Sequence, residues 1–193
     1  MALDLPFTAI EGGIASVAAV PGRFQIVSDP RDEVRVVVDY AHTDDALKNL
    51  LETARPLASG RLITVFGCGG DRDRTKRPLM GAVAARLSDL VIVTSDNPRS
   101  EDPERIVDQI RRGIVTPAER SGSKGPRGTP SMAIVDRRDA IERAIRDARP
   151  GDLVLIAGKG HEKYQVIGDR TLPFDDVEIA AAALSRRTRT RVS

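Results

Sequence analysis

The chain has few of the residues that most often carry metal, redox or nucleic-acid chemistry. Its 193 residues include one cysteine, two histidines and no tryptophan, and aromatic residues make up 3% of the chain. The single thiol, Cys68, cannot form an internal disulfide, and thiols and imidazoles are too few for a zinc ribbon or a histidine-rich site, so we expect no metal site. The shortage of aromatic rings argues against proteins that stack bases of RNA or single-stranded DNA.

The chain also lacks a strong net charge and long apolar runs. Its 30 Lys and Arg residues against 28 Asp and Glu residues leave a net charge of +2, too little for a general nucleic-acid-binding protein. No apolar run is long enough to span a bilayer, and the acidic residues Asp4 and Glu11 argue against a secretory signal. We therefore expect a cytoplasmic protein that binds neither membrane nor nucleic acid, with residues 186–193 forming a frayed, solvated basic tail.

Apolar runs alternate with helical patterns along most of the chain, as in parallel strands joined by crossover helices. Strands are predicted at 35–39, 62–66, 90–94, 132–135 and 153–157. Helices are predicted around 46–54, 106–114 and 140–145, where apolar residues recur on one face, and Asp102 and Pro103 start the second of these. The sequence thus predicts a Rossmann-like α/β domain with a mostly parallel sheet of about six strands and flanking helices.

Four segments fall outside this alternation. Residues 116–130 are rich in glycine and proline, which predicts a mobile loop. Residues 8–20 form a helical pattern that ends at Pro21 and Gly22 before a short strand, like the end of a preceding domain. Residues 164–167 and 171–174 predict an antiparallel hairpin at one sheet edge, followed by an alanine-rich final helix.

Polar residues and glycines collect directly after four of the predicted strands. In parallel α/β sheets, ligands bind at the carboxyl ends of the strands. The segments that follow the strands are Asp-Tyr-Ala-His at 39–42, Gly-Cys-Gly-Gly-Asp-Arg-Asp at 67–73, Ser-Asp-Asn-Pro-Arg at 95–99 and Gly-Lys-Gly-His-Glu at 158–162. One such loop needs only turn chemistry to explain it, but four together predict a ligand site.

Two nucleotide-binding motifs do not fit these glycines. In the dinucleotide fingerprint, the third glycine would fall at Arg72. In the P-loop, the serine or threonine after the lysine would fall at Gly160. The sequence therefore predicts neither a nicotinamide site nor a Walker-type ATP site.

The charged side chains in the same loops suit a zwitterionic ligand. Arg72 and Arg99 can each bind a carboxylate through two parallel hydrogen bonds, whereas Asp96 and Glu162 can hold an ammonium group. Taken alone, Arg99 is better explained as a surface arginine that pairs with Glu101 or Asp102. The combination of both charges predicts an amino-acid site.

These loop segments, together with Phe174-Asp175-Asp176, resemble the C-terminal domain of the Mur ligases, in the same order and from about Pro21 to the final helix. Asp-Asn-Pro-Arg at 96–99 is similar to the motif of the branch that selects meso-diaminopimelate over lysine. The resemblance implies two sets of binding residues. The meso-diaminopimelate set is Arg72, Asp96, Asn97, Pro98, Arg99, Gly158 and Glu162. The nucleotide set is Arg23, Asp39 and His42.

The resemblance further implies an ATP-dependent, peptide-bond-forming ligase of peptidoglycan precursor synthesis. Such enzymes add meso-diaminopimelate to UDP-N-acetylmuramoyl-L-alanyl-D-glutamate, and the amino group attacks an acyl phosphate. This domain would orient the amine, with no catalytic residue of its own. ATP, Mg²⁺ and the UDP-N-acetylmuramoyl dipeptide would be bound mainly by domains that the chain does not contain. We therefore expect a monomeric fragment that is inactive alone.

The expected division of the chain is residues 1–22 as the end of an ATPase domain and a linker, 23–185 as the amino-acid-binding domain, and 186–193 as the basic tail. Asp44 stands where the family usually has proline. Two other hypotheses remain open: a lysine-adding or folylpolyglutamate-type ligase domain, and a non-catalytic amino-acid-binding module.

Overall fold

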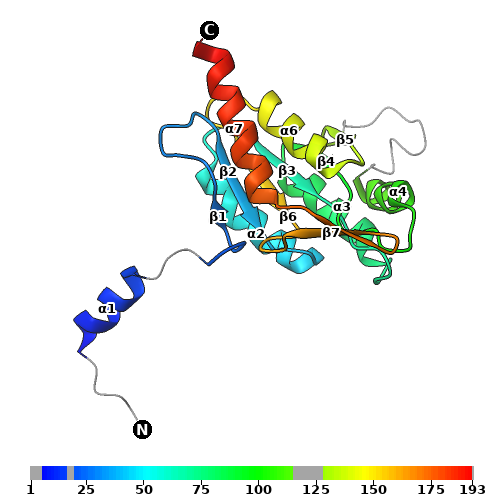
Figure 1. Ribbon diagram of the computed structural model, residues 1–193, viewed down its shortest axis with the longest axis horizontal. Coiled ribbons are helices and arrows are strands. Elements are labelled where there is room, and N and C mark those ends of the chain that lie inside the picture. Colours follow the sequence, from blue (N-terminus) through cyan, green and yellow to red (C-terminus); the bar gives the residue numbers. More distant parts are fainter. Residues whose placement is uncertain (1–5, 17–19, 115–127, 193) are drawn as a thin grey trace.

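A six-stranded sheet forms the centre of the molecule, in the order β1-β2-β6-β3-β4-β5 (Figure 1). The computed structural model describes residues 6–16, 20–114 and 128–192. The strands are β1 (Gln25–Ile26), β2 (Arg35–Asp39), β3 (Leu62–Phe66), β4 (Leu90–Val93), β5 (Ser131–Ala133) and β6 (Leu153–Ala157). Only β1 and β2 pair in the antiparallel sense, and every other neighbouring pair is parallel. The predicted six-stranded, mostly parallel sheet is confirmed.

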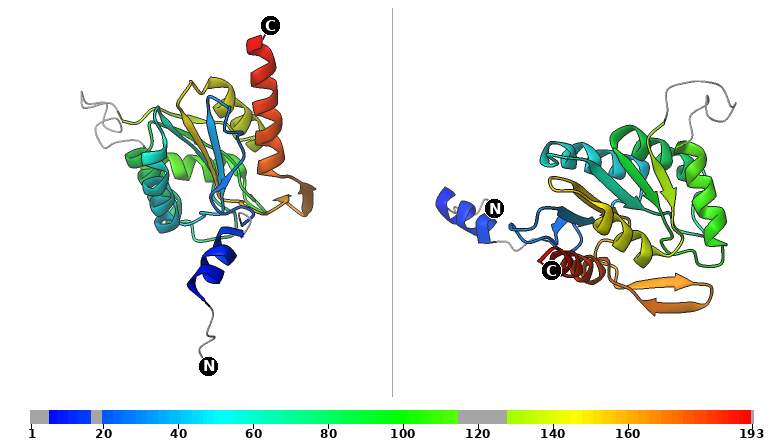
Figure 2. Two further views of the ribbon diagram at one scale, coloured as in Figure 1. Left: turned by 90° about the vertical axis from the view of Figure 1, so that its left-hand side faces the viewer. Right: turned by 90° about the horizontal axis from the view of Figure 1, so that it is seen from above.

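Helices cover both faces of this sheet (Figure 2). On one face lie α2 (Asp44–Ala54), which continues into the short 3₁₀ helix η1 (Arg55–Leu57), α3 (Lys76–Leu87) and α4 (Pro103–Ile114). On the other lie α6 (Arg137–Asp147) and α7 (Asp176–Val192). Successive strand residues alternate between the two apolar cores: Val37 and Leu155 face the first, whereas Val36 and Ile156 face the second. Both faces of the sheet are therefore buried, as the continuous apolar strands predict.

Short polar side chains define where the predicted helices begin. The Ala46 amide donates to Thr43 Oγ1 at 3.2 Å, and the Asp139 amide donates to Asp136 Oδ1 at 2.9 Å. The Glu104 amide donates to Asp102 Oδ1 at 2.9 Å, one residue before α4 begins at Pro103. The predicted start of α4 is confirmed.

Helix α3 was not among the helices placed from the sequence. It packs against both α2 and α4, and its apolar residues lie around the whole helix and show no single face. The crossing with α4 is close, because a Cβ on Gly81 would meet the Ile110 carbonyl oxygen at 2.2 Å. The buried face of α3 carries Arg77 and Gly81, whereas Leu79 is 51% exposed, so the apolar residues form no amphipathic stripe.

The predicted antiparallel hairpin is present as a separate two-stranded sheet, β7 (Tyr164–Ile167) and β8 (Arg170–Pro173). It attaches to the loop after β4 through the backbone. The Arg99 amide donates to the Val166 carbonyl at 3.0 Å, and the Gly168 amide donates to the Arg99 carbonyl at 2.7 Å. The hairpin therefore lies over the carboxyl ends of the strands and is connected to the ligand-site loops.

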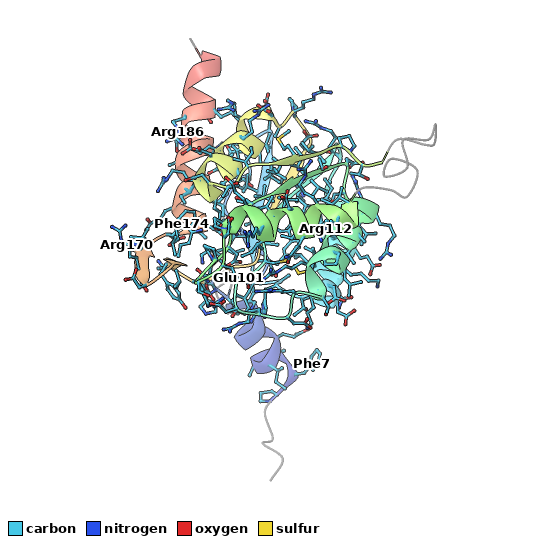
Figure 3. The ribbon with its side chains drawn as sticks, turned by 90° about the vertical axis from the view of Figure 1, so that its right-hand side faces the viewer. Phe7, Glu101, Arg112, Arg170, Phe174 and Arg186 are labelled. Carbon is cyan, nitrogen blue, oxygen red and sulfur yellow. The ribbon has the colours of Figure 1, made fainter. Side chains whose placement is uncertain are left out.

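The two ends of the chain differ in how they contact the domain. At the N-terminal end, α1 (Phe7–Ser16) lies apart from the sheet, and the Phe7 side chain is 72% exposed (Figure 3). The prediction of a frayed tail at 186–193 is wrong for its described part, because α7 continues to Val192. Arg186 pairs with Glu142 at 2.8 Å, and Arg187 donates to the Ile145 carbonyl, which fastens the helix to α6.

Two further expectations concern parts of the chain with special composition. Most of the glycine- and proline-rich loop at 116–130 falls outside the described residues, which resume at 128. In the part of the chain that the structure describes, no helix combines the length and apolar character needed to cross a bilayer.

Candidate amino-acid site

A cavity of about 500 Å³ opens at the carboxyl ends of the parallel strands. It is lined by the loops that follow β2, β3, β4 and β6, together with the start of β7. Six of the seven residues predicted for amino-acid binding line it: Arg72, Asp96, Asn97, Arg99, Gly158 and Glu162. The seventh, Pro98, is buried with its carbonyl oxygen against Gly70. The four predicted ligand loops thus meet in one place.

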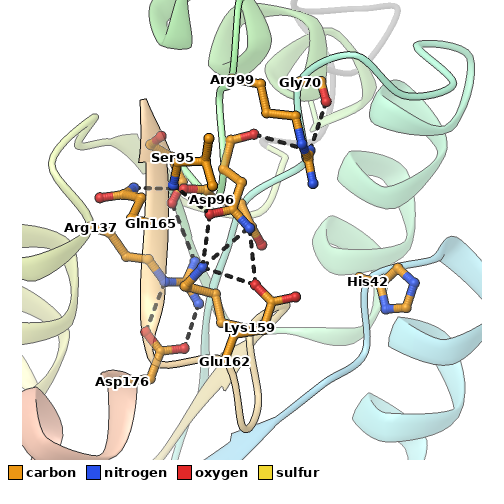
Figure 4. A network of polar contacts seen from close by, with 12 residues as sticks. His42, Gly70, Ser95, Asp96, Arg99, Arg137, Lys159, Glu162, Gln165 and Asp176 are labelled. Atoms are coloured by element: carbon orange, nitrogen blue, oxygen red, sulfur yellow. Dashed lines mark hydrogen bonds and ion pairs between the residues drawn. The ribbon is translucent and has the colours of Figure 1, made fainter. Parts of the chain in front are cut away.

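Arg99 is held in an unusual backbone conformation beside this cavity. Its φ of 52° lies in the left-handed region, and the two hydrogen bonds to the β7–β8 hairpin keep it there. The Arg99 Nη1 atom donates to the Gly70 carbonyl at 2.8 Å (Figure 4). The alternative pairings do not occur among these described residues, because Asp102 pairs with Arg105 and Glu101 pairs with Arg77. Arg99 therefore presents its half-buried guanidinium to the cavity.

Arg72 lies at the more exposed rim of the same cavity. Its Nη1 atom donates to the Asp71 carbonyl at 3.1 Å, and the side chain is exposed. Gly69 lies next to both arginine side chains. A Cβ at this position would be 3.0 Å from Arg99 Nη1 and 3.5 Å from Arg72 Cγ. Both arginines line the cavity, with Gly69 next to each of them.

The carboxylates of Asp96 and Glu162 form the acidic side of the cavity, and an unpredicted, buried lysine lies against them. Lys159 is fully buried, and its Nζ atom lies 3.2 Å from Glu162 Oε2, 3.8 Å from Asp96 Oδ1 and 3.1 Å from Asn97 Oδ1. Burial raises the pKa of Asp96, an effect that the charges of Arg137 and Lys159 oppose. Lys159 was not among the residues predicted to bind the ligand, although its place between Gly158 and Glu162 was a signal that it belongs to the site.

A second unpredicted group lies beneath Asp96. The Arg137 and Asp176 side chains are fully buried and paired, with Nη2 to Oδ2 at 2.8 Å and Nε to Oδ1 at 2.9 Å (Figure 4). Arg137 also donates to the Ala157 carbonyl at 3.0 Å and to the Ser95 carbonyl at 3.4 Å. It thereby joins the ends of β4 and β6 to the start of α7. Sequence alone offered no sign that an arginine opening a helix would be buried.

Arg77 is another buried arginine that joins loops around the cavity. It is 1% exposed and donates to both carboxylate oxygens of Glu101, at 3.0 and 2.8 Å, and to the Gly69 carbonyl at 3.1 Å. These hydrogen bonds lower the pKa of Glu101 to about 2. Glu101 also accepts from the Asp71 amide at 2.7 Å, so this pair holds the glycine-rich loop against the start of α4.

The three residues predicted for nucleotide contact lie at the end of β2. The guanidinium of Arg23 lies 4.7 Å from the centre of the Tyr40 ring, which also contacts the rings of His42 and His161. The Asp39 carboxylate accepts from the Phe24 amide at 2.7 Å and the Ala41 amide at 2.8 Å. This group offers cationic and aromatic surface, which suits a nucleotide. The described residues do not offer a comparable set of magnesium ligands, because they contain no group of three or more His, Cys, Asp or Glu that could hold a metal ion.

Comparisons with known proteins agree with this architecture. The family profile described as "Mur ligase, glutamate ligase domain" matches residues 22–160. The UDP-N-acetylmuramoyl-L-alanyl-D-glutamate–2,6-diaminopimelate ligase of Gloeobacter violaceus is 53% identical over 187 residues, which cover 97% of this chain and 36% of that protein. The ligase of the same name from Syntrophomonas wolfei is 54% identical over 175 residues, covering 91% of this chain and 34% of that protein. The chain thus spans about a third of these relatives.

Solved structures give the same result for the fold. A structure of a UDP-N-acetylmuramoyl-L-alanyl-D-glutamate–2,6-diaminopimelate ligase is 43% identical, has a TM-score of 0.77, and covers 95% of this chain and 35% of that chain. A folylpolyglutamate synthase/dihydrofolate synthase of Yersinia pestis, complexed with AMPPNP and a manganese ion, shares the fold at 23% identity and a TM-score of 0.63, over 95% of this chain and 35% of that chain. From the family profile and these relatives, we conclude that the chain belongs to the Mur ligase family and comprises its C-terminal, glutamate ligase domain.

Proposed function

We propose that the chain is the amino-acid-binding domain of an ATP-dependent ligase that adds meso-diaminopimelate to UDP-N-acetylmuramoyl-L-alanyl-D-glutamate. One observation carries the proposal: the cationic residues Arg72 and Arg99 and the acidic residues Asp96 and Glu162 line a single cavity of about 500 Å³. That volume lies within the range of small-molecule sites. Carboxylate and ammonium groups of one zwitterionic ligand would each meet an opposite charge there. The names of the close relatives point to the same substrate.

Selection against lysine follows from Arg99. Lysine has no carboxylate at the end of its side chain, so it would leave the half-buried guanidinium without a partner. The cost is about 1–3 kcal/mol for an unsatisfied buried polar group, and more for a charged one. A site built to bind a polar group rejects the analogue that lacks it more strongly than an apolar pocket rejects a missing methylene.

The task of this domain in the ligase reaction is to hold the amine of the incoming amino acid. Glu162 and Asp96 would orient the ammonium group at the strand ends, and delivery of a correctly placed amine reduces the entropic barrier to peptide-bond formation. ATP supplies the phosphoryl group that activates the acceptor carboxylate. Arg23 and His42 would contact the nucleotide, and Asp39 would place Arg23 through its bond to the Phe24 amide. Mg²⁺ and most of the nucleotide would be held outside this chain.

We further propose that the amino-acid-binding domain begins near residue 23 and that residues 1–22 connect it to a preceding domain. The isolation of α1 from the sheet supports this division. We place the end of the domain at the end of α7, because that helix stays packed on α6 beyond residue 185.

Calorimetry on the 193-residue chain tests the proposal. We expect meso-diaminopimelate to bind about 10- to 150-fold more tightly than L-lysine, the equivalent of a charged hydrogen-bonded pair worth about 1.5–3 kcal/mol. Arg99→Ala should remove most of this advantage, and Arg99→Lys should also weaken binding because an ammonium cannot reproduce the planar two-point contact.

Arg105→Ala is the matched control. Its side chain is 83% exposed on α4 and pairs with Asp102, so both affinities should stay unchanged. A preference for lysine, or equal affinity for the two amino acids, would show that the cavity is not a meso-diaminopimelate site.

A further inference from the structure

The acidic side of the cavity already contains a cation of its own. Lys159 is 0% exposed, and its ammonium group lies between Asp96 and Glu162, at 3.8 and 3.2 Å from the nearest carboxylate oxygens (Figure 4). It also lies 5.6 Å from the centre of the Tyr164 ring. Burying a lysine completely is costly unless its charge is compensated, so this position requires a specific explanation.

Lys159 also determines how Asn97 presents its amide. Asn97 Oδ1 accepts from Lys159 Nζ at 3.1 Å and from the Val166 amide at 3.0 Å, while Asn97 Nδ2 donates to Glu162 Oε2 at 3.0 Å. A reversed amide would direct its NH₂ group at an ammonium and at a backbone N–H. Glu162 therefore receives two donors, one from Asn97 and one from Lys159, and its carboxylate is fixed in place.

The charged side chains around Lys159 do not cancel completely. Three carboxylates lie together, those of Asp96, Glu162 and Asp176, and two cations accompany them, Lys159 and Arg137. Cys68 and Tyr164 also face the group, and burial raises the pKa of the Cys68 thiol to about 12, which keeps that thiol neutral. The formal charges of the five charged side chains sum to one net negative charge, and without Lys159 the sum would be two negative charges. Burial raises the pKa of Asp96, and the charges of Arg137 and Lys159 favour its ionised form.

We propose that Lys159 is a positioning residue that fixes Glu162 and Asn97 and sets the acidic side of the cavity to a single net negative charge, suited to one ammonium group. The ligand class that fits is an α-amino acid head with one ammonium. This inference rests on the proposed function for the identity of the ligand, but the role of Lys159 in the free protein can be tested without any ligand.

The first test measures the stability of the free 193-residue chain as a function of pH, for the wild type, for Lys159→Met and for Lys163→Met. In Lys159→Met, Asp96 and Glu162 face each other as like charges, so one proton is shared between them at a pKa above the unfolded value. A group with a raised folded-state pKa contributes stability that is lost as the pH rises through that pKa. The unfolding constant of Lys159→Met should therefore increase relative to wild type between about pH 5 and 8, by up to about tenfold per pH unit.

Lys163→Met serves as the control for loss of a nearby lysine. Its side chain is 75% exposed and pairs with Asp175, away from the cavity. It should follow the wild-type pH dependence. The double variant Lys159→Met/Glu162→Gln removes one charge of each sign and should return to the wild-type slope. If Lys159→Met has the same pH slope as the wild type, or if the double variant keeps the steep slope, the charge-setting role is refuted. A variant that is unfolded at pH 8 should regain its fold at pH 5, and failure to do so at any pH also refutes it.

The second test measures meso-diaminopimelate affinity against pH in the same variants. Wild-type affinity should be flat near neutral pH, whereas Lys159→Met should bind more tightly as the pH rises, by up to about tenfold per unit, because the incoming ammonium must displace the shared proton. A flat profile for Lys159→Met would count against the proposal. If the wild type binds no meso-diaminopimelate, the proposed function fails, while the stability test still decides the role of Lys159.

Discussion

The buried Arg137–Asp176 pair allows a quantitative prediction about stability. Both side chains are fully buried, and Arg137 makes two hydrogen bonds to Asp176 and donates to the carbonyls of Ala157 and Ser95. Replacing Arg137 by Met leaves Asp176 as an uncompensated buried charge and removes a donor from both carbonyls. Breaking a buried pair from one side typically costs about 3–5 kcal/mol. We expect a loss of this size in the free energy of unfolding.

Thermal and urea unfolding followed by circular dichroism measures the effect. For a domain of this size, each kcal/mol corresponds to roughly 2–4 °C, so the Tm of Arg137→Met should fall by about 10 °C. Arg138→Met is the matched control, because this neighbouring arginine is exposed and its replacement should shift the Tm very little. Removing both charges, with Arg137→Met and Asp176→Leu together, should cost less than Arg137→Met alone.

The reasoning would be refuted by an Arg137→Met chain whose Tm matches that of the Arg138 control. It would also be refuted if the double variant were less stable than Arg137→Met. Either result would mean that the buried charge of Asp176 is compensated by something other than Arg137.

Three further predictions concern the loops around the cavity. The pKa of Glu101 is lowered to about 2, chiefly by its hydrogen bonds from Arg77. The ionised carboxylate therefore contributes stability above pH 4.5, and this contribution is lost as the pH falls towards 2. In urea titrations at different pH values, Glu101→Gln should make the loss of stability in acid less steep. Gly70→Ala should lower the Tm by several degrees in a thermal scan, because a Cβ there would lie 1.8 Å from the Pro98 carbonyl oxygen and force the two loops apart. Burial raises the pKa of Cys68 to about 12, so iodoacetamide at pH 8 should modify it slowly in the folded chain and quickly in urea, as followed by mass spectrometry; equal rates would show that the thiol is accessible as thiolate.

Local patterns were sufficient to predict much of the fold and of the cavity. Strands β2, β3 and β6 have their predicted bounds, because continuous Val, Ile and Leu runs are typical of a sheet buried on both faces. The loops after four of the strands were expected to meet, because parallel strands place their carboxyl ends at the same edge. Six predicted residues line one cavity for that reason. Their roles in binding amino acid stay a prediction.

Other features could not be predicted from local patterns. Helix α3 has no apolar stripe, because its buried face includes Arg77 and Gly81 while Leu79 is exposed. The end of α7 was expected to fray, but Arg186 and Arg187 find partners on α6, a helix about 40 residues earlier in the chain. Such contacts join distant segments and leave no periodic trace in the sequence.

The sequence by itself determined the succession of strands and of the helices other than α3, the loops that bear the charged groups, and the family to which the chain belongs, because these depend on local periodicity and on short motifs. Only the tertiary structure decided which charges compensate one another. Arg77 and Arg137 are indistinguishable from surface residues in the sequence, yet folding buries them, together with Lys159, against carboxylates from other segments. The physical reason is that burial and pairing are properties of the assembled loops, and an isolated segment has neither.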